Sequence, residues 1–301
     1  MKENLGALVT ETQNLKYTNL DTMNSAEIIQ AMNEEDKTVA LAVEKEIPNI
    51  AKAVDKIVVA FKSSGRLFYV GAGTSGRLGV LDASECPPTF GVEPEMVQAI
   101  MAGGDSAYIK AVENAEDDAS LGRNDLLKRK ITSKDVVVGV AASGRTPYVM
   151  GALEVANEVG ATTIAVVCNP ESAMTKVAQI TIAPVVGPEV LTGSTRLKAG
   201  TAQKMVLNML TTASMVQIGK VFGNLMVDVQ MTNAKLVDRA VRIIQKATNC
   251  SPEIATKALK DCGSTKIAIV SILAEVEATE AKQLLELADG YVRKAITLKK
   301  K

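Results

Sequence analysis

The sequence predicts an α/β fold in which helices flank a central parallel sheet, followed by a small all-helical module. Short apolar runs, typical of buried strands, alternate with longer segments whose apolar residues recur at helical spacing. Such alternation favours a parallel sheet with right-handed crossovers. After about residue 236 only short helical segments remain, and 301 residues suffice for a main domain with an appendage.

The expected elements follow from these patterns in chain order. Helices are predicted over 25–63, over 148–159 after Pro147 in the first turn, and over 198–220. The expected strands are 67–70, 96–101, 136–140, 162–168 and 179–185. The module is expected to contain helices over 236–247, 251–260 and 278–288, with 266–273 ambiguous between strand and helix. We expect an N-terminal helical segment over 1–55, the sheet domain over 56–238 and the helical module over 239–301.

Composition excludes several classes of function. The 34 basic residues balance 34 acidic ones and aromatics make up 3%, so no nucleic-acid partner is expected. The N-terminus carries Glu3 and Glu11 and does not resemble a signal peptide, and no apolar run approaches membrane-spanning length. The four cysteines are widely spaced without a CxxC pair, which argues against a disulfide framework or a zinc site. We therefore expect a cytoplasmic protein without a membrane partner.

The chain contains no histidine. Acid and base steps near neutral pH must therefore fall to carboxylates, Lys, Tyr or Cys with adjusted pKa values. Histidine metal sites and Ser-His-Asp triads are excluded.

The segment Gly71–Gly76 matches GxGxxG directly after a predicted strand and at the start of a helix. It is a weak signal for NAD, because no acidic residue stands at the end of the next strand to bind a ribose. The loop instead supplies the hydroxyls of Thr74 and Ser75 beside its glycines.

Two further strand ends repeat this chemistry, in Ser143-Gly144-Arg145-Thr146 and Thr192-Gly193-Ser194-Thr195. Glycines let the backbone approach a ligand, hydroxyls donate to phosphate or sugar oxygens, and a following helix N-terminus favours an anion. Any one such loop could be an ordinary turn with a helix cap. Repetition at successive strand ends favours a site for a small phosphorylated ligand. Arg145 and Lys198 could complete a phosphate cradle, or either could be a surface charge.

Two carboxylates are candidate acid–base groups. Glu85 precedes Pro87 and Pro88, which are expected to end its helix; a carboxylate at a helix C-terminus is disfavoured, so its protonated form is expected. Glu116 belongs to an expected helix with four acidic residues over 111–118, and such runs are commonly solvated helix faces.

Taken together, these segments resemble the bacterial N-acetylmuramic acid 6-phosphate etherases. The resemblance spans nearly the whole chain and is carried by 71–79, 82–88, 141–148 and 193–202. It implies a sugar-isomerase-type three-layer fold and a homodimer with active sites near the subunit interface. The implied reaction cleaves the lactyl ether of N-acetylmuramic acid 6-phosphate to N-acetylglucosamine 6-phosphate and D-lactate, in the recycling of cell-wall sugars.

The resemblance also implies which residues form the site, without a metal or other cofactor. Glu85 and Glu116 are the implied catalytic pair; our hypothesis is that Glu116 removes the carbon 2 proton and Glu85 protonates departing lactate, but the exchanged assignment fits equally well. The expected substrate contacts are Gly73, Thr74, Ser75, Gly76, Glu113, Ser143, Gly144, Ser194, Thr195, Arg196 and Lys198.

Three other functions compete with this one. A non-catalytic phosphosugar sensor is the strongest, because the glucokinase regulatory protein resembles this family; that protein has a second sugar-isomerase-type domain, for which this chain is too short. A phosphosugar aldose–ketose isomerase would share the loops. A dinucleotide enzyme is the most distant alternative.

Overall fold

The computed structural model describes residues 9–299 except 111, 113 and 232. The chain forms two compact units. The first contains the described residues up to Ser84 together with Glu95–Thr211, and the second contains Glu85–Pro94 and the described residues from Thr212 onward. The boundaries predicted near residues 55 and 238 remain predictions.

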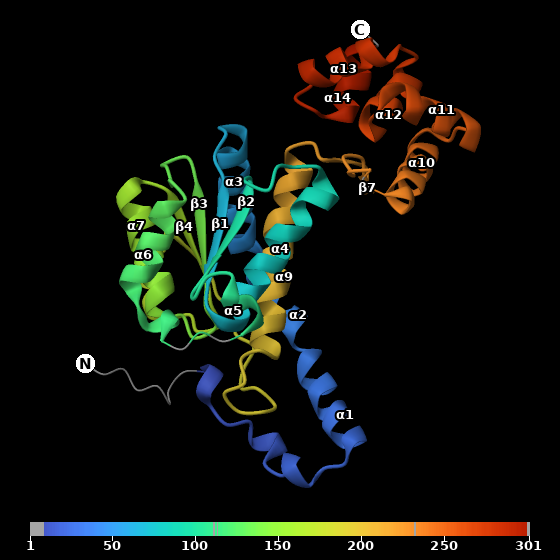
Figure 1. The fold of residues 1–301 in the computed structure, drawn as a ribbon. Coiled ribbons are helices and arrows are strands. Elements are labelled where there is room, and N and C mark those ends of the chain that lie inside the picture. Colours follow the sequence, from blue (N-terminus) through green and yellow to red (C-terminus); the bar gives the residue numbers. More distant parts are fainter. Residues whose placement is uncertain (1–8, 111, 113, 232, 300–301) are drawn as a thin grey trace. The chain divides into compact units, whose positions relative to one another are not determined.

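The first unit is built on a five-stranded parallel sheet with the order β2-β1-β3-β4-β5, as far as the described residues go (Figure 1). Each strand coincides with a predicted apolar run, and this confirms the predicted fold class. The strands are β1 (Leu67–Gly71), β2 (Val97–Met101), β3 (Val136–Val140), β4 (Thr162–Val166) and β5 (Ile180–Ile182).

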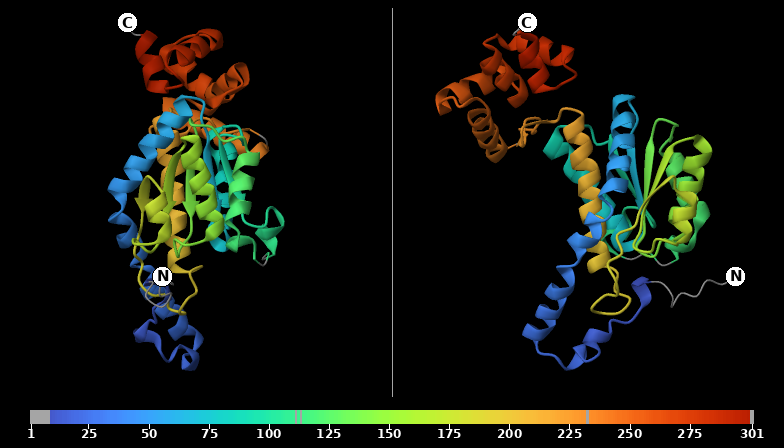
Figure 2. Two further views of the ribbon diagram at one scale, coloured as in Figure 1. Left: turned by 90° about the vertical axis from the view of Figure 1, so that its left-hand side faces the viewer. Right: turned by 180° about the vertical axis from the view of Figure 1, so that it is seen from behind.

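Helices cover both faces of the sheet (Figures 1 and 2). Successive side chains of β1 point to opposite faces of the sheet, so they contact a different layer of helices on each face. Phe68 and Val70 enter a core with α7 (Pro147–Val159), which packs on α6 (Ala119–Lys128). Tyr69 points the other way; its hydroxyl donates to Asp82 at 2.9 Å and lies 3.4 Å from the Leu207 carbonyl oxygen. The helices of this second face are α3 (Ile47–Lys62), α4 (Gly73–Phe90) and α9 (Lys198–Gln217).

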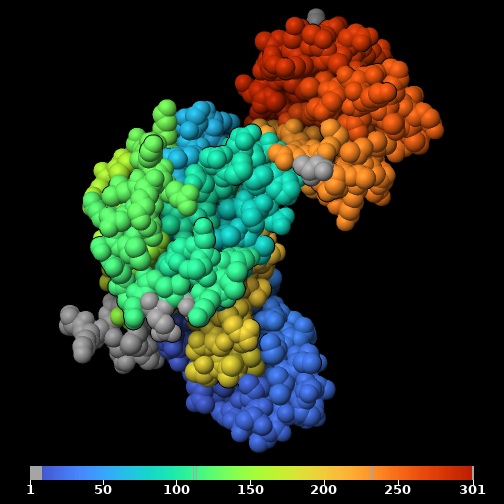
Figure 3. Space-filling view, in the orientation of Figure 1, coloured from blue at the N-terminus to red at the C-terminus, as the bar shows by residue number. Residues whose placement is uncertain are grey.

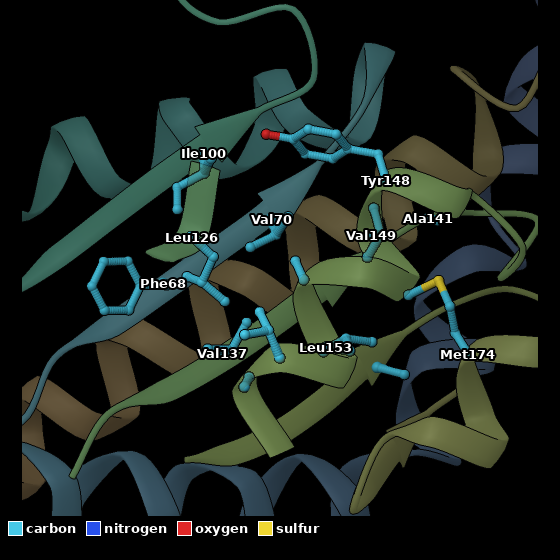
Figure 4. Close-up of a cluster of buried hydrophobic side chains, with 14 of the residues drawn as sticks. Phe68, Val70, Ile100, Leu126, Val137, Ala141, Tyr148, Val149, Leu153 and Met174 are labelled. Atoms are coloured by element: carbon cyan, nitrogen blue, oxygen red, sulfur yellow. The ribbon is translucent and has the colours of Figure 1, made fainter. Parts of the chain in front are cut away.

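The core between the sheet and α7 consists of large side chains that are fully buried (Figure 4). Phe68, Leu126, Tyr148 and Leu153 each have no exposed surface. Burying side chains of this size contributes roughly 2 kcal/mol each, so this core holds the strand ends in place.

The N-terminal part of the first unit is helical, as predicted. Short 3₁₀ turns, η2 (Val9–Glu11), η3 (Leu15–Tyr17) and η4 (Leu20–Thr22), lead to α1 (Ser25–Asp36) and α2 (Val39–Glu44). Asn24 begins α1 with a capping box, because its side chain accepts from the amide of Glu27 at 3.1 Å while Glu27 accepts from the Asn24 amide at 2.8 Å.

The prediction that Pro87 and Pro88 end the helix of Glu85 is wrong. Helix α4 continues through both prolines to Phe90. Neither proline can donate a backbone hydrogen bond, so the carbonyls four residues earlier, at Ala83 and Ser84, lose their helical partners. Glu85 therefore lies inside the helix rather than at its end.

The predicted acidic helix over 111–118 is also wrong for the residues described there. After α5 (Ser106–Ile109), Asn114 has a left-handed backbone with φ of 61°, which a continuous α-helix does not allow. Glu116 lies in the 3₁₀ turn η5 (Ala115–Asp117), and the Asp118 side chain then caps α6 by accepting from the Leu121 amide at 3.0 Å.

The second unit contains a short antiparallel hairpin and a set of helices around their own apolar core. The ambiguous segment 266–273 is helical, because it lies within α12 (Thr265–Ala274). Lys266 on this helix is buried, and its ammonium lies 2.5 Å from Asp228. The other elements of this unit are β6 (Val221–Phe222), β7 (Leu225–Met226), α10 (Ala234–Thr248), α11 (Pro252–Cys262), α13 (Ala278–Leu287) and α14 (Val292–Lys299). A short helix of the first unit, α8 (Ala173–Val177), lies between β4 and β5 in the chain.

A buried carboxylate ties the start of β1 to the start of β3. Asp135 accepts from the Arg66 amide at 2.8 Å, from its guanidinium at 2.8 Å and from the Thr132 amide at 2.8 Å. Burial of Asp135 acts to raise its pKa, but Arg66 and these amides outweigh burial and hold the pKa below its usual range.

We expect Asp135→Asn to lower the free energy of unfolding by about 2 kcal/mol at pH 7, because it leaves Arg66 without its charged partner. The lowered pKa means that this stabilisation is present above about pH 4 and disappears as the pH falls through the folded-state value. Urea titrations of both proteins at pH 7 and pH 3 measure the difference. Glu158→Gln, which removes an exposed partner of Arg123, is the control and should cost under about 1 kcal/mol. An Asp135→Asn penalty that is equal at both pH values would contradict this account.

Candidate functional site

The glycine- and hydroxyl-rich loops meet at one edge of the sheet. Because β1, β3, β4 and β5 are parallel, the loops that follow them leave from the same edge. The neighbours β1 and β3 lead into helices on opposite faces, α4 and α7. A crevice at such a switch point is the usual ligand site of open α/β sheets.

The loop after β1 needs its glycines for close backbone approach. A Cβ on Gly71 would lie 2.7 Å from the Gly76 nitrogen, and one on Gly76 would lie 2.8 Å from the Gly71 carbonyl oxygen. Gly73 has φ of 52° and open space where a side chain would stand. The turn is therefore tight on its inner side and open on its outer side.

The side chains of Ser75 and Thr74 in this loop face helix α9. Ser75 is buried and donates to the Gln203 side-chain oxygen at 2.8 Å, while the Gln203 side-chain nitrogen is buried without a partner in the described chain. The Thr74 methyl lies 3.5 Å from the position of a Cβ on Gly200. Gln203 thus orients Ser75, a role that sequence reasoning missed because a glutamine inside a long helix carries no distinguishing pattern.

The loop after β3 is held by polar residues of the loop after β4. The Asn169 amide donates to the Ala142 carbonyl at 3.0 Å and more weakly to the Ser143 carbonyl at 3.5 Å. Gly144 has φ of 69°, and a Cβ there would overlap the Ser172 hydroxyl. Ser143 is half-buried beside this glycine.

The loop that precedes α9 carries Ser194 and Thr195, both half-buried, and Arg196, which is exposed. Lys198, the first residue of α9, is 3% exposed, and its ammonium lies 2.5 Å from Glu35 of α1. The structure therefore places the Lys198 ammonium in a buried ion pair with Glu35.

A cavity of about 280 Å³ adjoins the loop after β1. Glu116 lines it from η5, so the structure brings one predicted catalytic carboxylate together with one predicted loop. Its described lining is Ala72, Gly73, Arg77, Met101, Ala102, Ala107, Val112, Asn114, Glu116 and Asp117.

Arg77 fixes one wall of this cavity. Its guanidinium on α4 donates to the Ala107 carbonyl at 3.0 Å and to the Tyr108 carbonyl at 2.9 Å, both on α5. These bonds hold the guanidinium against α5, so we assign Arg77 to the wall of the cavity.

Glu85 belongs to the second compact unit, where it is exposed on α4. One turn earlier, Asp82 is buried in the first unit and accepts from Tyr69 at 2.9 Å and from the Asn208 side chain at 2.6 Å. Burial of Asp82 raises its pKa above the usual range. Asp82 thus joins α4 to β1 and α9. The predicted contact Glu113 lies outside the described residues.

Comparison with known proteins identifies the domains. Residues 49–157 match the glucokinase regulatory protein N-terminal SIS domain, residues 120–213 match the SIS domain, and residues 223–262 match the C-terminal lid domain of glucokinase regulatory protein. A phosphoheptose isomerase from Francisella tularensis superposes with a TM-score of 0.50 at 19% identity, over 65% of this chain and all of that one. This likeness concerns the fold alone.

Relatives over the full length are much more similar. The chain is 57% identical to the N-acetylmuramic acid 6-phosphate etherase of Photorhabdus laumondii over 298 residues, 99% of each chain. It is 59% identical to that of Vibrio campbellii over 293 residues, 97% of this chain and 95% of the relative. Identity at this level over the whole length confirms the resemblance seen in the sequence, and the chain belongs to the N-acetylmuramic acid 6-phosphate etherase family.

Proposed function

We propose that this protein is a carbon–oxygen lyase that cleaves the D-lactyl ether of N-acetylmuramic acid 6-phosphate, giving N-acetylglucosamine 6-phosphate and D-lactate in the recycling of cell-wall sugars. The observation that carries the proposal is a carboxylate, Glu116, in a cavity beside the glycine-rich loop, within a chain 57% identical to etherases throughout. The phosphate would bind the hydroxyl loops, and no metal or other cofactor is part of the proposal.

The chemistry suits a site whose acid–base groups are carboxylates. In the open-chain sugar carbon 2 is α to the aldehyde, so its proton is acidic, and the ether oxygen on carbon 3 is β to the aldehyde, so it can leave once that proton is removed. A base removes that proton, the bond between carbon 3 and the ether oxygen breaks, and an acid protonates the departing lactate. Water then adds its hydroxyl to carbon 3 and carbon 2 regains a proton, so the ring can close as N-acetylglucosamine 6-phosphate.

We assign the base to Glu116 and the acid to Glu85. One group must be ionised while the other is protonated at the same pH, which requires two different environments. Glu116 lines the cavity together with Asp117. The exchanged assignment leads to the same products and is separated from this one by the isotope experiment in the Discussion.

The oligomer proposed is a homodimer with the site near its interface. It is supported by large apolar side chains left exposed on the N-terminal helices, namely Ile29 at 65%, Leu41 at 60% and Val59 at 65%. None of the helices among the described residues is long and apolar enough to cross a membrane. The four cysteines are free thiols, which supports a cytoplasmic location.

The matches to the glucokinase regulatory protein favour one alternative, a phosphosugar-binding regulator without catalysis. Incubation of the purified protein with N-acetylmuramic acid 6-phosphate separates the two functions. We expect stoichiometric D-lactate and N-acetylglucosamine 6-phosphate by mass spectrometry. Saturable binding of the substrate without lactate release would select the regulator. In a parallel incubation with a hexose phosphate, aldose–ketose interconversion would select an isomerase.

A further inference from the structure

The loop before α9 is closed at its base by a buried carboxylate. Glu189, which is 1% exposed, accepts from the Lys198 amide at 2.9 Å and from the Ala199 amide at 3.0 Å. These are the first amides of the helix, where an anion is stabilised by the helix dipole. The carboxylate therefore occupies the anion site of this helix end, and the loop between Glu189 and Lys198 presents Ser194 and Thr195.

The side chain of Lys198 fastens the same base to helix α1. Its ammonium donates to Glu35 at 2.5 Å, and the exposed fractions of the two side chains are 3% and 9%. Burial of Glu35 acts to raise its pKa, but the hydrogen bond and charge of Lys198 outweigh it and hold the pKa below its usual value. Asn14 and Lys16 also lower the pKa of Glu35, and the Lys16 ammonium lies 3.5 Å from its carboxylate.

The N-terminal segment contacts Asn169, which holds the loop after β3, and approaches the loop before α9. Thr10 is 1% exposed, and its hydroxyl oxygen accepts from the Asn169 amide at 3.1 Å; the same amide holds the loop after β3. The Glu11 carboxylate lies 3.6 Å from the position of a Cβ on Gly193. Figure 3 shows the loop before α9, in yellow, against the N-terminal helices, in blue.

We propose that Glu35 is a positioning residue, which acts through Lys198 to hold Ser194 and Thr195 where they bind the phosphate of the substrate. The inference rests on the proposed function. Glu35 does not touch the substrate in this account, and Lys198 serves as the link between α1 and the loop. Removing the Glu35 carboxylate would leave the buried Lys198 ammonium without its charged partner, which costs free energy of folding. We expect the base of the loop to shift so that this ammonium reaches water or another acceptor.

Glu35→Gln removes the negative charge of the Glu35 side chain and nearly keeps its shape, so it tests the proposal. We expect KM for N-acetylmuramic acid 6-phosphate to rise about tenfold while kcat stays within about twofold, because an interaction with the unreacting phosphate is weakened equally in the ground and transition states. The affinity for the product N-acetylglucosamine 6-phosphate, measured by calorimetry, should fall by the same factor. Glu34→Gln is the matched control, because Glu34 neighbours Glu35 on α1 but pairs with Lys37 at the exposed surface. It should leave both constants unchanged.

Two further measurements test the role of Glu35 independently of KM. Hydrogen exchange of the ligand-free protein should show faster exchange at residues 190–197 in Glu35→Gln, a readout that does not depend on the reaction. Glu35→Asp, which keeps the charge, should restore most of the affinity and serves if Glu35→Gln does not fold. A folded Glu35→Gln protein with unchanged KM and unchanged exchange would overturn the positioning role, as would a loss confined to kcat. Absence of lactate release by the unaltered protein would instead refute the proposed function.

Discussion

Replacing Glu116 by glutamine is expected to lower kcat for lactate release by about 1,000-fold, because general base catalysis by a placed carboxylate contributes on this scale. Glu116 is exposed on η5, so the substitution should leave the melting temperature within about 2 °C of the parent. Lactate release under saturating substrate and a thermal melt measure the two quantities. Asp117→Asn removes the same charge from the next position of the same turn and should change kcat less than about fivefold.

Deuterium exchange separates the two assignments of acid and base. In heavy water a Glu85→Gln protein that retains Glu116 as the base should exchange the carbon 2 hydrogen of the substrate while releasing little lactate. Glu116→Gln should do neither. If Glu85→Gln blocks exchange and Glu116→Gln permits it, the roles are exchanged; if Glu116→Gln releases lactate at the parental rate, Glu116 is not catalytic.

Gly122→Ala is expected to lower the free energy of unfolding by about 4 kcal/mol or to prevent folding. A Cβ on Gly122 of α6 would overlap the carbonyl oxygen of Tyr148 on α7, and one on Gly151 of α7 would overlap the carbonyl of Ala119 on α6. The obstructing atoms are backbone, so no side-chain rotation relieves the overlap. The two helices pack this closely because both glycines are present.

Gly200→Ala on α9 is the matched control. Its Cβ would lie at ordinary contact distance, 3.5 Å from the Thr74 methyl and 3.6 Å from the Thr195 carbonyl oxygen. Alanine also has the higher helix propensity, by about 1 kcal/mol. Urea unfolding should therefore show this variant to be at least as stable as the parent. Equal stabilities for Gly122→Ala and Gly200→Ala would contradict the packing argument.

The strands and their loops were predictable because their signals are local. The runs at 67–70 and 136–140 are short, apolar and followed at once by glycine and hydroxyl residues, and these became β1 and β3 with the expected loops. The long helix after Lys198 was equally clear from its apolar spacing.

What could not be predicted depends on contacts between distant segments. The path of α4 through Pro87 and Pro88 contradicts the local rule for proline. From the sequence Lys198 could be a phosphate ligand or a surface charge, and its pairing with Glu35, more than 160 residues earlier, has no local signal. The hairpin β6–β7 was missed because each strand has only two residues.

In the proposed reaction the ether is cleaved by elimination and rehydration of the sugar. The most direct measurement is turnover of N-acetylmuramic acid 6-phosphate in water enriched in ¹⁸O, with mass spectrometry of both products. We predict one ¹⁸O at carbon 3 of N-acetylglucosamine 6-phosphate and none at the hydroxyl of D-lactate, because the ether oxygen leaves with the lactate. Label in the lactate hydroxyl and none at carbon 3 would mean that water attacks the lactyl carbon, and would contradict this account.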